Sequence, residues 1–375
     1  MEEVRATGTH HLRSLLLAAI AAGGAALFFA LAYSGANLLL PPSPQGGLWS
    51  LCSWDCGWYK SVVENGYHTI PDANNGRMVA NYGFFPGFPL SVGLLMRATG
   101  FSFVAAGVAL NAFYSLLFCW IALRHYRELE LSDEWQTMVF LAAFLLSPWS
   151  LYNHVPYSEM LFNLSALGTF VYWRRGNYAA AAAFGVVLTG TRLSGIILPL
   201  VLLAELLIRE RGQVIGILLR PDGRFRALAI MPLGLAAFLV FLFLHIGDPL
   251  AYFHIQQTGW GQGLRNPLAI LVNGVGVGPR NLYAVIAYFV ASAVILAGLV
   301  IRRIPFPLAS FAWLVPSVSL ASMLAGQARY ALALFPLYLI VPALPRTLQL
   351  LLIPALALGQ AALVYYWIQL SPMLV

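Results

Sequence analysis

The sequence predicts an all-α protein that crosses a membrane many times. Of its 375 residues, 60% are hydrophobic and 9% are charged, so polar groups are too few to cover the surface of a soluble protein of this length. Apolar runs long enough to cross about 30 Å of hydrocarbon recur from residue 14 to residue 370 with short breaks between them. The breaks leave no room for a separate soluble domain, so we expect residues 1–375 to form a single membrane domain.

The apolar runs predict about eleven membrane-spanning helices. They cover residues 14–40, 101–123, 134–150, 157–173, 177–190, 193–209, 226–246, 281–301, 304–323, 329–345 and 347–370. The first run is too long for a cleaved signal peptide and lacks a convincing cleavage site, so we expect it to remain as the first span. A further apolar segment, residues 84–97, is short and contains Pro86 and Pro89. It could cross the membrane or lie within the outer leaflet.

The distribution of positive charge decides how segment 84–97 is interpreted. If it does not cross and the N-terminus is inside, fourteen of the 21 Lys and Arg residues lie on the inner side and seven on the outer side. If it crossed, later clusters such as Arg174 and Arg175 would face outward, against the tendency of cytoplasmic loops to be positive. We therefore interpret 84–97 as a surface or re-entrant helix. Membrane anchoring also explains the net charge of +7, so no nucleic-acid partner is expected.

The predicted topology gathers several polar segments on the outer side of the membrane. The two long outer loops cover residues 41–100 and 247–280, and we expect them to form the active face. The acids that face outward are Asp55, Glu64, Asp72, Glu159 and Asp248. The inner connections mix charges of both signs at short spacing, as solvated turns do, and we interpret them as connectors.

Asp55 lies in the first long polar interruption, within S-W-D-C-G-W-Y-K-S-V-V-E-N-G. This stretch predicts a short helix that Ser53 caps and that stops at Asn65-Gly66, with Asp55 in the first turn, where the helix dipole favours an anion. The helix is expected to lie flat at the membrane surface, because aromatic residues fall on one stripe. The stripe holds Trp54, Trp58, Val62 and Asn65. On these grounds alone, Asp55 could be only a helix-start acid.

The three cysteines are too few for a disulfide framework. Cys119 lies in an apolar run and is expected to be a core residue. Cys52 and Cys56 are one helical turn apart, so a disulfide between them is sterically possible in an oxidising compartment. We favour two separate small residues, and no nearby His or acid completes a four-ligand zinc pattern.

Several motifs occur in an order that resembles a known family. In the first outer loop they are W-D-C-G-W-Y, E-N-G-Y and F-F-P-G-F-P, of which the last is the most specific. P-Y-S-E (156–159), G-D-P-L-A-Y-F-H-I-Q-Q (247–257) and R-Y-x-L-x-L-F-P (329–336) follow. Together they resemble the PIG-V family, the second mannosyltransferase of GPI-anchor assembly, and its prokaryotic relatives. Cys56 departs from the pattern, since relatives often have a small residue there.

The resemblance implies a fold and a reaction. The fold is a GT-C-like bundle whose long first outer loop carries surface or re-entrant helices. The reaction is an inverting transfer of a hexose, with mannose implied, from a polyprenyl-phosphate donor to a hydroxyl on a glycolipid or glycan acceptor. No nucleotide-binding motif is present, which fits a donor held in the membrane lipid. No cofactor or metal is expected, because scattered histidines alone do not form a metal site.

Asp55 is our candidate for the catalytic base. Sugar transfer from a phosphate to a hydroxyl needs a carboxylate that accepts the hydroxyl proton and a cation that stabilises the departing phosphate. Asp55 lies among aromatic residues, where partial exclusion of water would make it a better proton acceptor and where a sugar could stack. These candidate substrate-binding aromatics are Trp54, Trp58 and Tyr59. By resemblance, Asp55 also corresponds to the acid of the first outer loop that is the base in the GT-C class.

Two other acids are candidate substrate contacts. Glu159 stands at the outer mouth of a span, where a carboxylate is expensive unless it is paired or functional. It could pair with Arg192 or hold an acceptor hydroxyl. Asp248 precedes Pro249 and could equally be the cap of a helix start. Gln257, at the end of the same stretch, is a further candidate for substrate binding.

Two arginines are candidates for binding the donor phosphate. Arg329 opens a span beside Tyr330, itself a candidate contact, and a guanidinium can bind a phosphate through two parallel hydrogen bonds. Arg192, in T-G-T-R-L-S-G, is the second candidate. Either arginine could instead be a membrane anchor whose charged end reaches the surface.

Two other functions use similar residues. A flippase or carrier of lipid-linked sugars would need a polar path through the middle of the membrane, whereas the span centres here are nearly free of charge. A ligase of lipid-linked glycans remains an alternative. Twenty arginines beside a single lysine, Lys60, indicate a high-GC genome. We therefore expect a multi-pass protein of a prokaryotic plasma membrane whose active site faces the periplasm or exterior.

Overall fold

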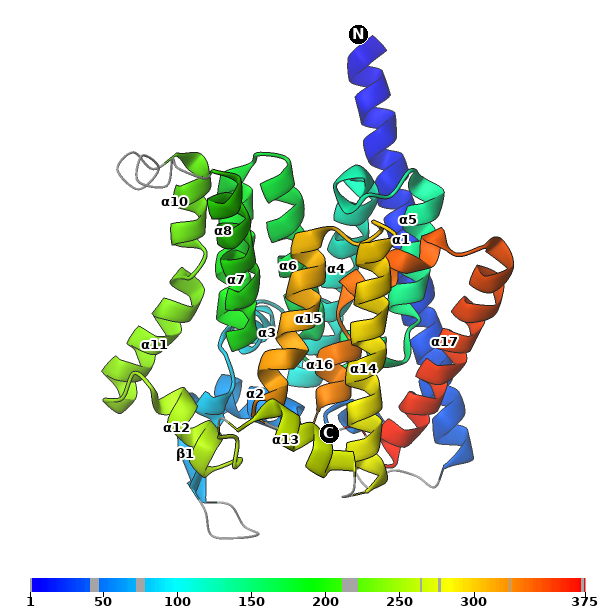
Figure 1. The fold of residues 1–375 in the computed structure, drawn as a ribbon. Coiled ribbons are helices and arrows are strands. Elements are labelled where there is room, and N and C mark those ends of the chain that lie inside the picture. Colours follow the sequence, from blue (N-terminus) through cyan, green and yellow to red (C-terminus); the bar gives the residue numbers. More distant parts are fainter. Residues whose placement is uncertain are drawn as a thin grey trace.

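The chain folds into a bundle of helices with one small hairpin of strands (Figure 1). The computed structural model describes residues 2–40, 47–71, 78–210, 222–263, 265–275, 278–322, 324, 326–371 and 374. Asp72, Arg77, Arg211 and Arg220, which the topology prediction uses, lie outside these residues. One large cluster of buried apolar side chains draws on helices from both ends of the chain. The structure confirms an all-α, multi-pass membrane protein.

Each of the eleven predicted runs corresponds to one helix or to two consecutive helical segments. The long or apolar helices are α1 (Glu2–Leu39), α4 (Phe103–Arg124), α5 (Glu134–Leu145), α6 (Glu159–Arg174), α7 (Tyr178–Thr191), α8 (Ile197–Arg209), α10 (Gly223–Ile230), α11 (Leu233–Ile246), α14 (Pro279–Val300), α15 (Phe306–Leu320), α16 (Gln327–Leu332) and α17 (Arg346–Ile368). Within the described residues, five segments are long and apolar enough to cross a membrane. They are His11–Leu39, Phe103–Arg124, Gly223–Ile246, Pro279–Val300 and Arg346–Ile368, and Tyr178–Thr191 and Phe306–Leu320 are shorter apolar helices.

Prolines explain two departures from unbroken helices. The run 226–246 is divided into α10 and α11 at Met231-Pro232, since proline lacks the amide hydrogen that a continuing helix needs. The run 329–345 is the short helix α16 followed by 3-10 turns over Phe335–Ala343, which contain Pro336 and Pro342. α16 is therefore a short helix and not the start of a long straight span.

The predicted outer loops lie together at one end of the bundle. This end carries α2 (Asp55–Asn65), α12 (Ala251–Thr258), α13 (Pro267–Val275) and the antiparallel strands β1 (Thr69–Pro71) and β2 (Met78–Ala80) (Figure 1). α3 (Gly87–Thr99) forms from the ambiguous segment. Its 13 residues extend about 20 Å, too short to cross the hydrocarbon, as the interpretation of segment 84–97 requires.

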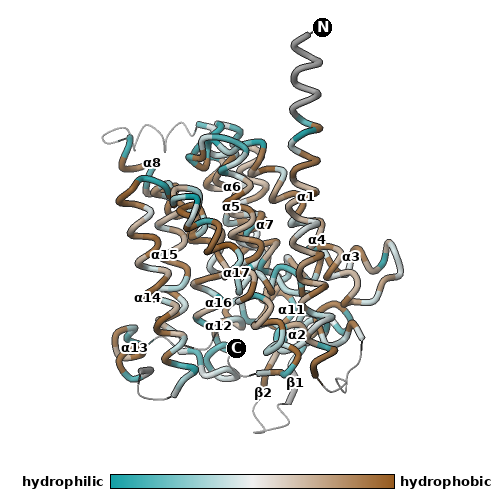
Figure 2. The backbone as a smooth tube through the Cα atoms, turned by 90° about the vertical axis from the view of Figure 1, so that its right-hand side faces the viewer, coloured by the Kyte–Doolittle hydropathy of each residue, from teal (hydrophilic) through white to brown (hydrophobic). Residues whose placement is uncertain are grey.

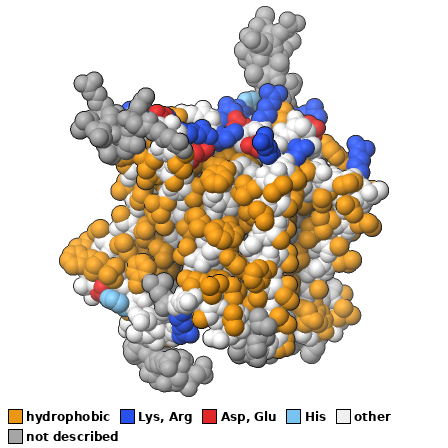
Figure 3. Space-filling model, viewed as in Figure 1, with side chains coloured by type: hydrophobic (Ala, Val, Ile, Leu, Met, Phe, Trp, Pro, Cys, Tyr) orange, Lys and Arg blue, Asp and Glu red, His pale blue; other side chains and the backbone are white. Residues whose placement is uncertain are grey.

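Polar residues gather toward the ends of the bundle. Figure 2 shows hydrophobic residues over the middle of the long helices and hydrophilic residues toward both ends. On the face in Figure 3, Lys and Arg side chains gather at the end opposite α2 and α12, above a broad apolar surface. This arrangement matches a helix bundle with its apolar belt in lipid.

Gly87, in F-F-P-G-F-P, lets α3 begin directly against the end of α7. A Cβ atom at this position would lie 2.7 Å from Oγ1 of Thr191 and 2.9 Å from the carbonyl oxygen of Gly190. Any larger residue would therefore separate the two segments. The motif thus brings the start of α3 against the end of α7, just before Arg192.

Two local predictions are wrong. Ser53 does not cap α2, because the helix begins at Asp55 after Trp54 and its start has no side-chain cap. Cys52 and Cys56 are joined in a disulfide, whereas we favoured two separate residues. The helix does end at Asn65, with Gly66 following at a φ of 72°, and Cys119 is a buried free cysteine, as predicted.

The orientation in the membrane gives a labelling prediction. Ser132 and Thr258 are both exposed. Ser132 comes just before α5, whose first residue, Glu134, pairs with Arg13 near the N-terminal end of α1. That end of the bundle is opposite α12, which carries Thr258 (Figure 1). In intact cells, we expect Thr258→Cys to react with a membrane-impermeant thiol reagent and Ser132→Cys to be protected, because α12 belongs to the predicted outer side. Both should react once the membrane is permeabilised, which controls for accessibility. If only Ser132→Cys were labelled in intact cells, the protein would have the opposite orientation in the membrane to the predicted one.

Candidate functional site

Four charged residues from distant parts of the chain meet at the end of the bundle that carries the outer loops. Asp55 is the first residue of α2 and Glu159 the first of α6. Arg192 follows the last residue of α7, and Arg329 lies in α16. We call these four residues the acid–arginine cluster.

Ion pairs link the cluster in a line of alternating charge. Nη1 of Arg329 lies 2.8 Å from Oδ2 of Asp55, and Nε of Arg329 lies 3.4 Å from Oε1 of Glu159. The same Oε1 accepts a hydrogen bond from Nη2 of Arg192 at 2.5 Å. Two carboxylates therefore balance two guanidinium groups.

The cluster is largely buried, and its exposure increases toward Asp55. The side chain of Glu159 is 2% exposed, that of Arg329 10%, that of Arg192 16% and that of Asp55 23%. Both arginines are bound to carboxylates and mostly buried, which does not fit membrane anchors whose charged ends reach the surface. Asp55 is the member with the most access for a substrate. Oε2 of Glu159 is buried and has no hydrogen-bond partner among the described residues.

Aromatic rings surround the two guanidinium groups. The guanidinium carbon of Arg329 lies 5.2, 5.6 and 5.2 Å from the ring centres of Tyr152, Tyr157 and Tyr330. The guanidinium of Arg192 also faces the Tyr330 ring, at 5.7 Å. Attraction between a cation and the face of an aromatic ring offsets part of the loss of hydration. Tyr330, predicted as a substrate contact, thus lies between the two arginines.

Tyr157 fixes the backbone on both sides of Trp54. Its hydroxyl donates to the carbonyl oxygen of Ser53 at 2.7 Å and accepts from the amide of Asp55 at 3.1 Å. Nδ2 of Asn111 in turn donates to the carbonyl oxygen of Tyr157 at 3.1 Å. The start of α2 is therefore attached to the segment that leads into Glu159.

Asn163 attaches α6 to the segment after α16. Its Nδ2 donates to the carbonyl oxygen of Ala333, and its Oδ1 accepts from the amide of Phe335, both at 3.0 Å. Asn163 is one turn beyond Glu159, so these bonds hold the chain near Arg329 against the start of α6. The side chain is 1% exposed, so its role is internal.

Tyr59 and Ser158 extend the network from Arg192. Nε of Arg192 donates to Oγ of Ser158 at 3.0 Å, and that oxygen lies 2.9 Å from the hydroxyl of Tyr59. Burial raises the pKa of Tyr59 to about 12, so its hydroxyl keeps its proton at ordinary pH. The hydroxyl of Tyr59 is thus linked to Arg192 through Ser158.

The two predicted tryptophans pack against other aromatic residues. The Trp54 ring meets that of Trp367 edge to face at 4.8 Å. The Trp58 ring stacks on Phe84 at 5.8 Å and meets Trp260 edge to face at 5.4 Å. These contacts occupy part of each ring, and both side chains remain partly exposed.

Asp248 and Gln257 lie apart from the cluster. Oδ1 of Asp248 accepts from the amide of Leu250 at 2.9 Å, and its Oδ2 lies 2.7 Å from Nδ1 of His254. The hydrogen bond with His254 lowers the pKa of Asp248. Asp248 is not the predicted helix cap, because α12 begins at Ala251 after Leu250 and its start has no side-chain cap. Gln257 is exposed on α12.

Sequence reasoning missed several residues that hold the site. Tyr157 and Ser158 lie inside the quoted P-Y-S-E motif, which was the available signal. Asn163 gives no comparable signal, because its N-L-S context (163–165) matches only the pattern of a glycosylation sequon. Tyr252 lies within the quoted 247–257 stretch. Burial raises its pKa, and its phenol is close enough to Tyr330 and Arg192 to interact with them electrostatically.

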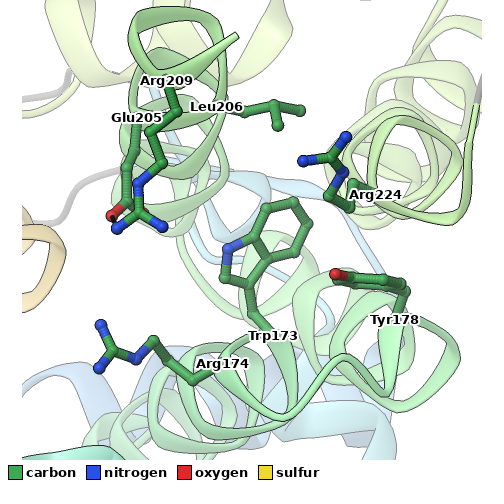
Figure 4. Close-up of a pocket in the computed structure, with 7 residues that line it drawn as sticks. All are labelled: Trp173, Arg174, Tyr178, Glu205, Leu206, Arg209 and Arg224. Atoms are coloured by element: carbon green, nitrogen blue, oxygen red, sulfur yellow. Dashed lines mark hydrogen bonds and ion pairs between the residues drawn. The ribbon is translucent and has the colours of Figure 1, made fainter. Parts of the chain in front are cut away.

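A separate cavity of about 490 Å³ lies at the opposite end of the bundle (Figure 4). It is lined by Trp173, Arg174, Tyr178, Glu205, Leu206, Arg209 and Arg224. Arg209 is paired with Glu205 at 2.6 Å, and Arg224 with Glu210 at 2.6 Å. The cavity lies at the end of the bundle away from the predicted outer loops, so we do not assign the donor phosphate to it.

Comparison with known proteins identifies no family. No protein-family model and no curated protein matches the chain. Among solved structures, it is similar to the crystal structure of ArnT from Cupriavidus metallidurans bound to undecaprenyl phosphate. The TM-score is 0.38 and 14% of aligned residues are identical, over 94% of this chain and 77% of ArnT. The PIG-V resemblance therefore stays a prediction.

Proposed function

We propose that the chain is an inverting glycosyltransferase that moves a hexose, mannose in the first instance, from a polyprenyl-phosphate donor to a hydroxyl acceptor. The acceptor is a glycolipid or glycan at the outer face of the membrane. The observation that carries this proposal is the pairing of the partly exposed carboxylate of Asp55 with Arg329 at 2.8 Å, at one end of a membrane bundle. The site thus combines a proton acceptor and a phosphate-binding cation where lipid headgroups lie.

The reaction follows from the two kinds of charge. Asp55 accepts the proton of the acceptor hydroxyl while its oxygen attacks the anomeric carbon of the sugar. The bond between that carbon and the phosphate oxygen breaks, and its electron pair leaves with the polyprenyl phosphate. Arg329 stabilises the charge that develops on this oxygen. A single displacement inverts the configuration of the anomeric carbon.

The Asp55–Arg329 ion pair adds a condition to this mechanism. In the structure, Oδ2 of Asp55 is bound to the guanidinium that the donor phosphate needs. An incoming phosphate competes for Arg329, and Asp55 is then free to bind the acceptor hydroxyl. The donor is therefore expected to bind before the acceptor. Arg192 and Glu159 remain paired behind them and keep Arg329 in place.

A flippase is the alternative function, and the placement of charge favours the transferase. In the five long apolar segments, which are fully described, every Asp, Glu, Lys and Arg lies within the first or last turn. A flippase needs polar groups near the middle of facing helices. A ligase of lipid-linked glycans would use the same acid and arginines, and only its product distinguishes it from the proposed transferase.

Vesicles that contain the purified protein distinguish transfer from translocation. With polyprenyl-phosphate-[³H]mannose in the bilayer and a membrane lipid extract as acceptor source, a transferase releases free polyprenyl phosphate and labels a new product. A flippase moves the intact donor between leaflets without cleaving it. Translocation without cleavage would therefore overturn the proposal.

Arg329→Lys is expected to weaken donor binding by about tenfold or more. Lysine keeps the positive charge but cannot form two parallel hydrogen bonds to a phosphate. Binding of the lipid donor to purified variants is the measurement. Arg97→Lys is the matched control, because Arg97 is exposed on α3. Unchanged donor affinity in a stably folded Arg329→Lys variant would remove Arg329 from the donor site.

A further inference from the structure

A disulfide encloses Asp55 in a small ring of the chain. The bridge joins Cys52, before the helix, to Cys56, in the first turn of α2, with their Cα atoms 5.1 Å apart. Cys56 is fully buried and Cys52 is partly buried against the main apolar core. Asp55 therefore lies in a ring of five residues whose two ends are anchored.

The ring holds a backbone conformation that a bulky residue rarely adopts. Trp54, directly before Asp55, has φ 50° and ψ −113°. A positive φ is uncommon for residues other than glycine and is maintained only where the surroundings impose it. Tyr157 binds the peptide groups on both sides of Trp54, and the Trp54 ring packs against Trp367. The disulfide is the covalent restraint at the same place.

The start of α2 has no side-chain cap that would add to the hydrogen bonds of Tyr157 and the packing of Trp54. Trp54 provides no side-chain cap, and Oγ of Ser53 is buried without a hydrogen-bond partner among the described residues. If Trp54 relaxed to a negative φ, the peptide plane before Asp55 would rotate. The carboxylate would then turn away from Arg329, although α2 could remain helical.

We propose that the Cys52–Cys56 disulfide is a positioning element for Asp55, so that sugar transfer requires the oxidised form. This inference rests on the proposed function. The ring is short, so closing it removes little entropy from the unfolded chain and should contribute little to overall stability. The effect is expected in turnover. The bridge also requires an oxidising compartment, which agrees with an active site on the outer face.

The test compares the parent with Cys52→Ala/Cys56→Ala. We expect kcat to fall by about 10²-fold, as for a catalytic group displaced by roughly 1 Å, while the donor KM changes by no more than about threefold. The melting temperature should stay close to that of the parent. Treating the folded parent with a phosphine reductant should lower kcat to the same level, and reoxidation should restore it. Cys119→Ala, which removes the buried free cysteine, should behave as the parent in every assay.

A second comparison shows whether the disulfide acts through Asp55. In an Asp55→Asn background, the two alanine substitutions should lower the residual rate no further, whereas an independent structural role would lower it again. The inference is overturned if the parent transfers sugar and the double variant matches its kcat, or if reduction impairs both equally. A parent that transfers no sugar, with the bridge verified by thiol alkylation and mass spectrometry, would instead overturn the proposed function.

Discussion

Asp55→Asn is expected to lower the rate of sugar transfer by about 10²- to 10⁴-fold, the usual contribution of general-base catalysis. The variant should still bind the lipid donor. Asparagine has nearly the shape of aspartate but cannot accept the acceptor proton. The structure adds a reason for retained or stronger donor binding, because Asp55 no longer competes for the guanidinium of Arg329. The measurement is a single-turnover rate at saturating donor, beside a donor-binding isotherm.

Glu64→Gln is the matched control for Asp55→Asn. Glu64 is on the same helix, but it is exposed and pairs with Lys60 at 2.8 Å, outside the acid–arginine cluster. Its loss should change the transfer rate by no more than a few-fold. If Asp55→Asn also transferred sugar within a few-fold of the parent rate, Asp55 would be only a helix-start residue.

Glu159→Gln is expected to lower the free energy of unfolding by about 3–5 kcal/mol, as when one partner of a buried ion pair is removed. Oε1 of Glu159 is close to both Arg192 and Arg329, and the glutamate side chain is 2% exposed. Glutamine would leave Arg192 without its carboxylate and the cluster with an excess positive charge. Unfolding by denaturant in detergent, followed by tryptophan fluorescence, gives the difference.

Glu205→Gln is the matched control for Glu159→Gln, because it removes the same charge from an ion pair that is more exposed. Glu205 also pairs with an arginine, Arg209, at 2.6 Å, but the arginine side chain is 69% exposed. An exposed pair of this kind contributes only about 0.3–0.5 kcal/mol. Equal losses of stability in the two variants would mean that Glu159 is not the internal counter-ion of the cluster.

Hydrophobicity and charge made the architecture predictable. Membrane-spanning length and the absence of charge are local properties, so each apolar run could be recognised from its own sequence. The same arginine count that gave the topology also placed α3 among the segments that do not cross. It brought Asp55, Glu159, Arg192 and Arg329 to one side, and the structure brings their side chains into contact.

The pairing inside the site was not predictable from the sequence. Which acid binds Arg329 depends on how α2, α6 and α16 pack, and no local pattern encodes that packing. The hydrogen bonds of Tyr157 and Asn163 are long-range and involve backbone groups, which carry no residue-specific signal. Helical spacing allowed a disulfide between Cys52 and Cys56, but we favoured two separate residues, because the positive φ of Trp54 between them cannot be read from the sequence pattern.

The central claim is that the acid–arginine cluster transfers a sugar from a polyprenyl phosphate. The most direct measurement incubates membranes that contain the protein with polyprenyl-phosphate-[³H]mannose and identifies the labelled product. We predict that label leaves the donor and appears in a glycolipid or glycan with the parent, and that membranes with Asp55→Asn form almost none. The claim would be contradicted if the label stayed on the donor when the parent protein was present in membranes that supply acceptors. It would also be contradicted if Asp55→Asn transferred sugar as well as the parent.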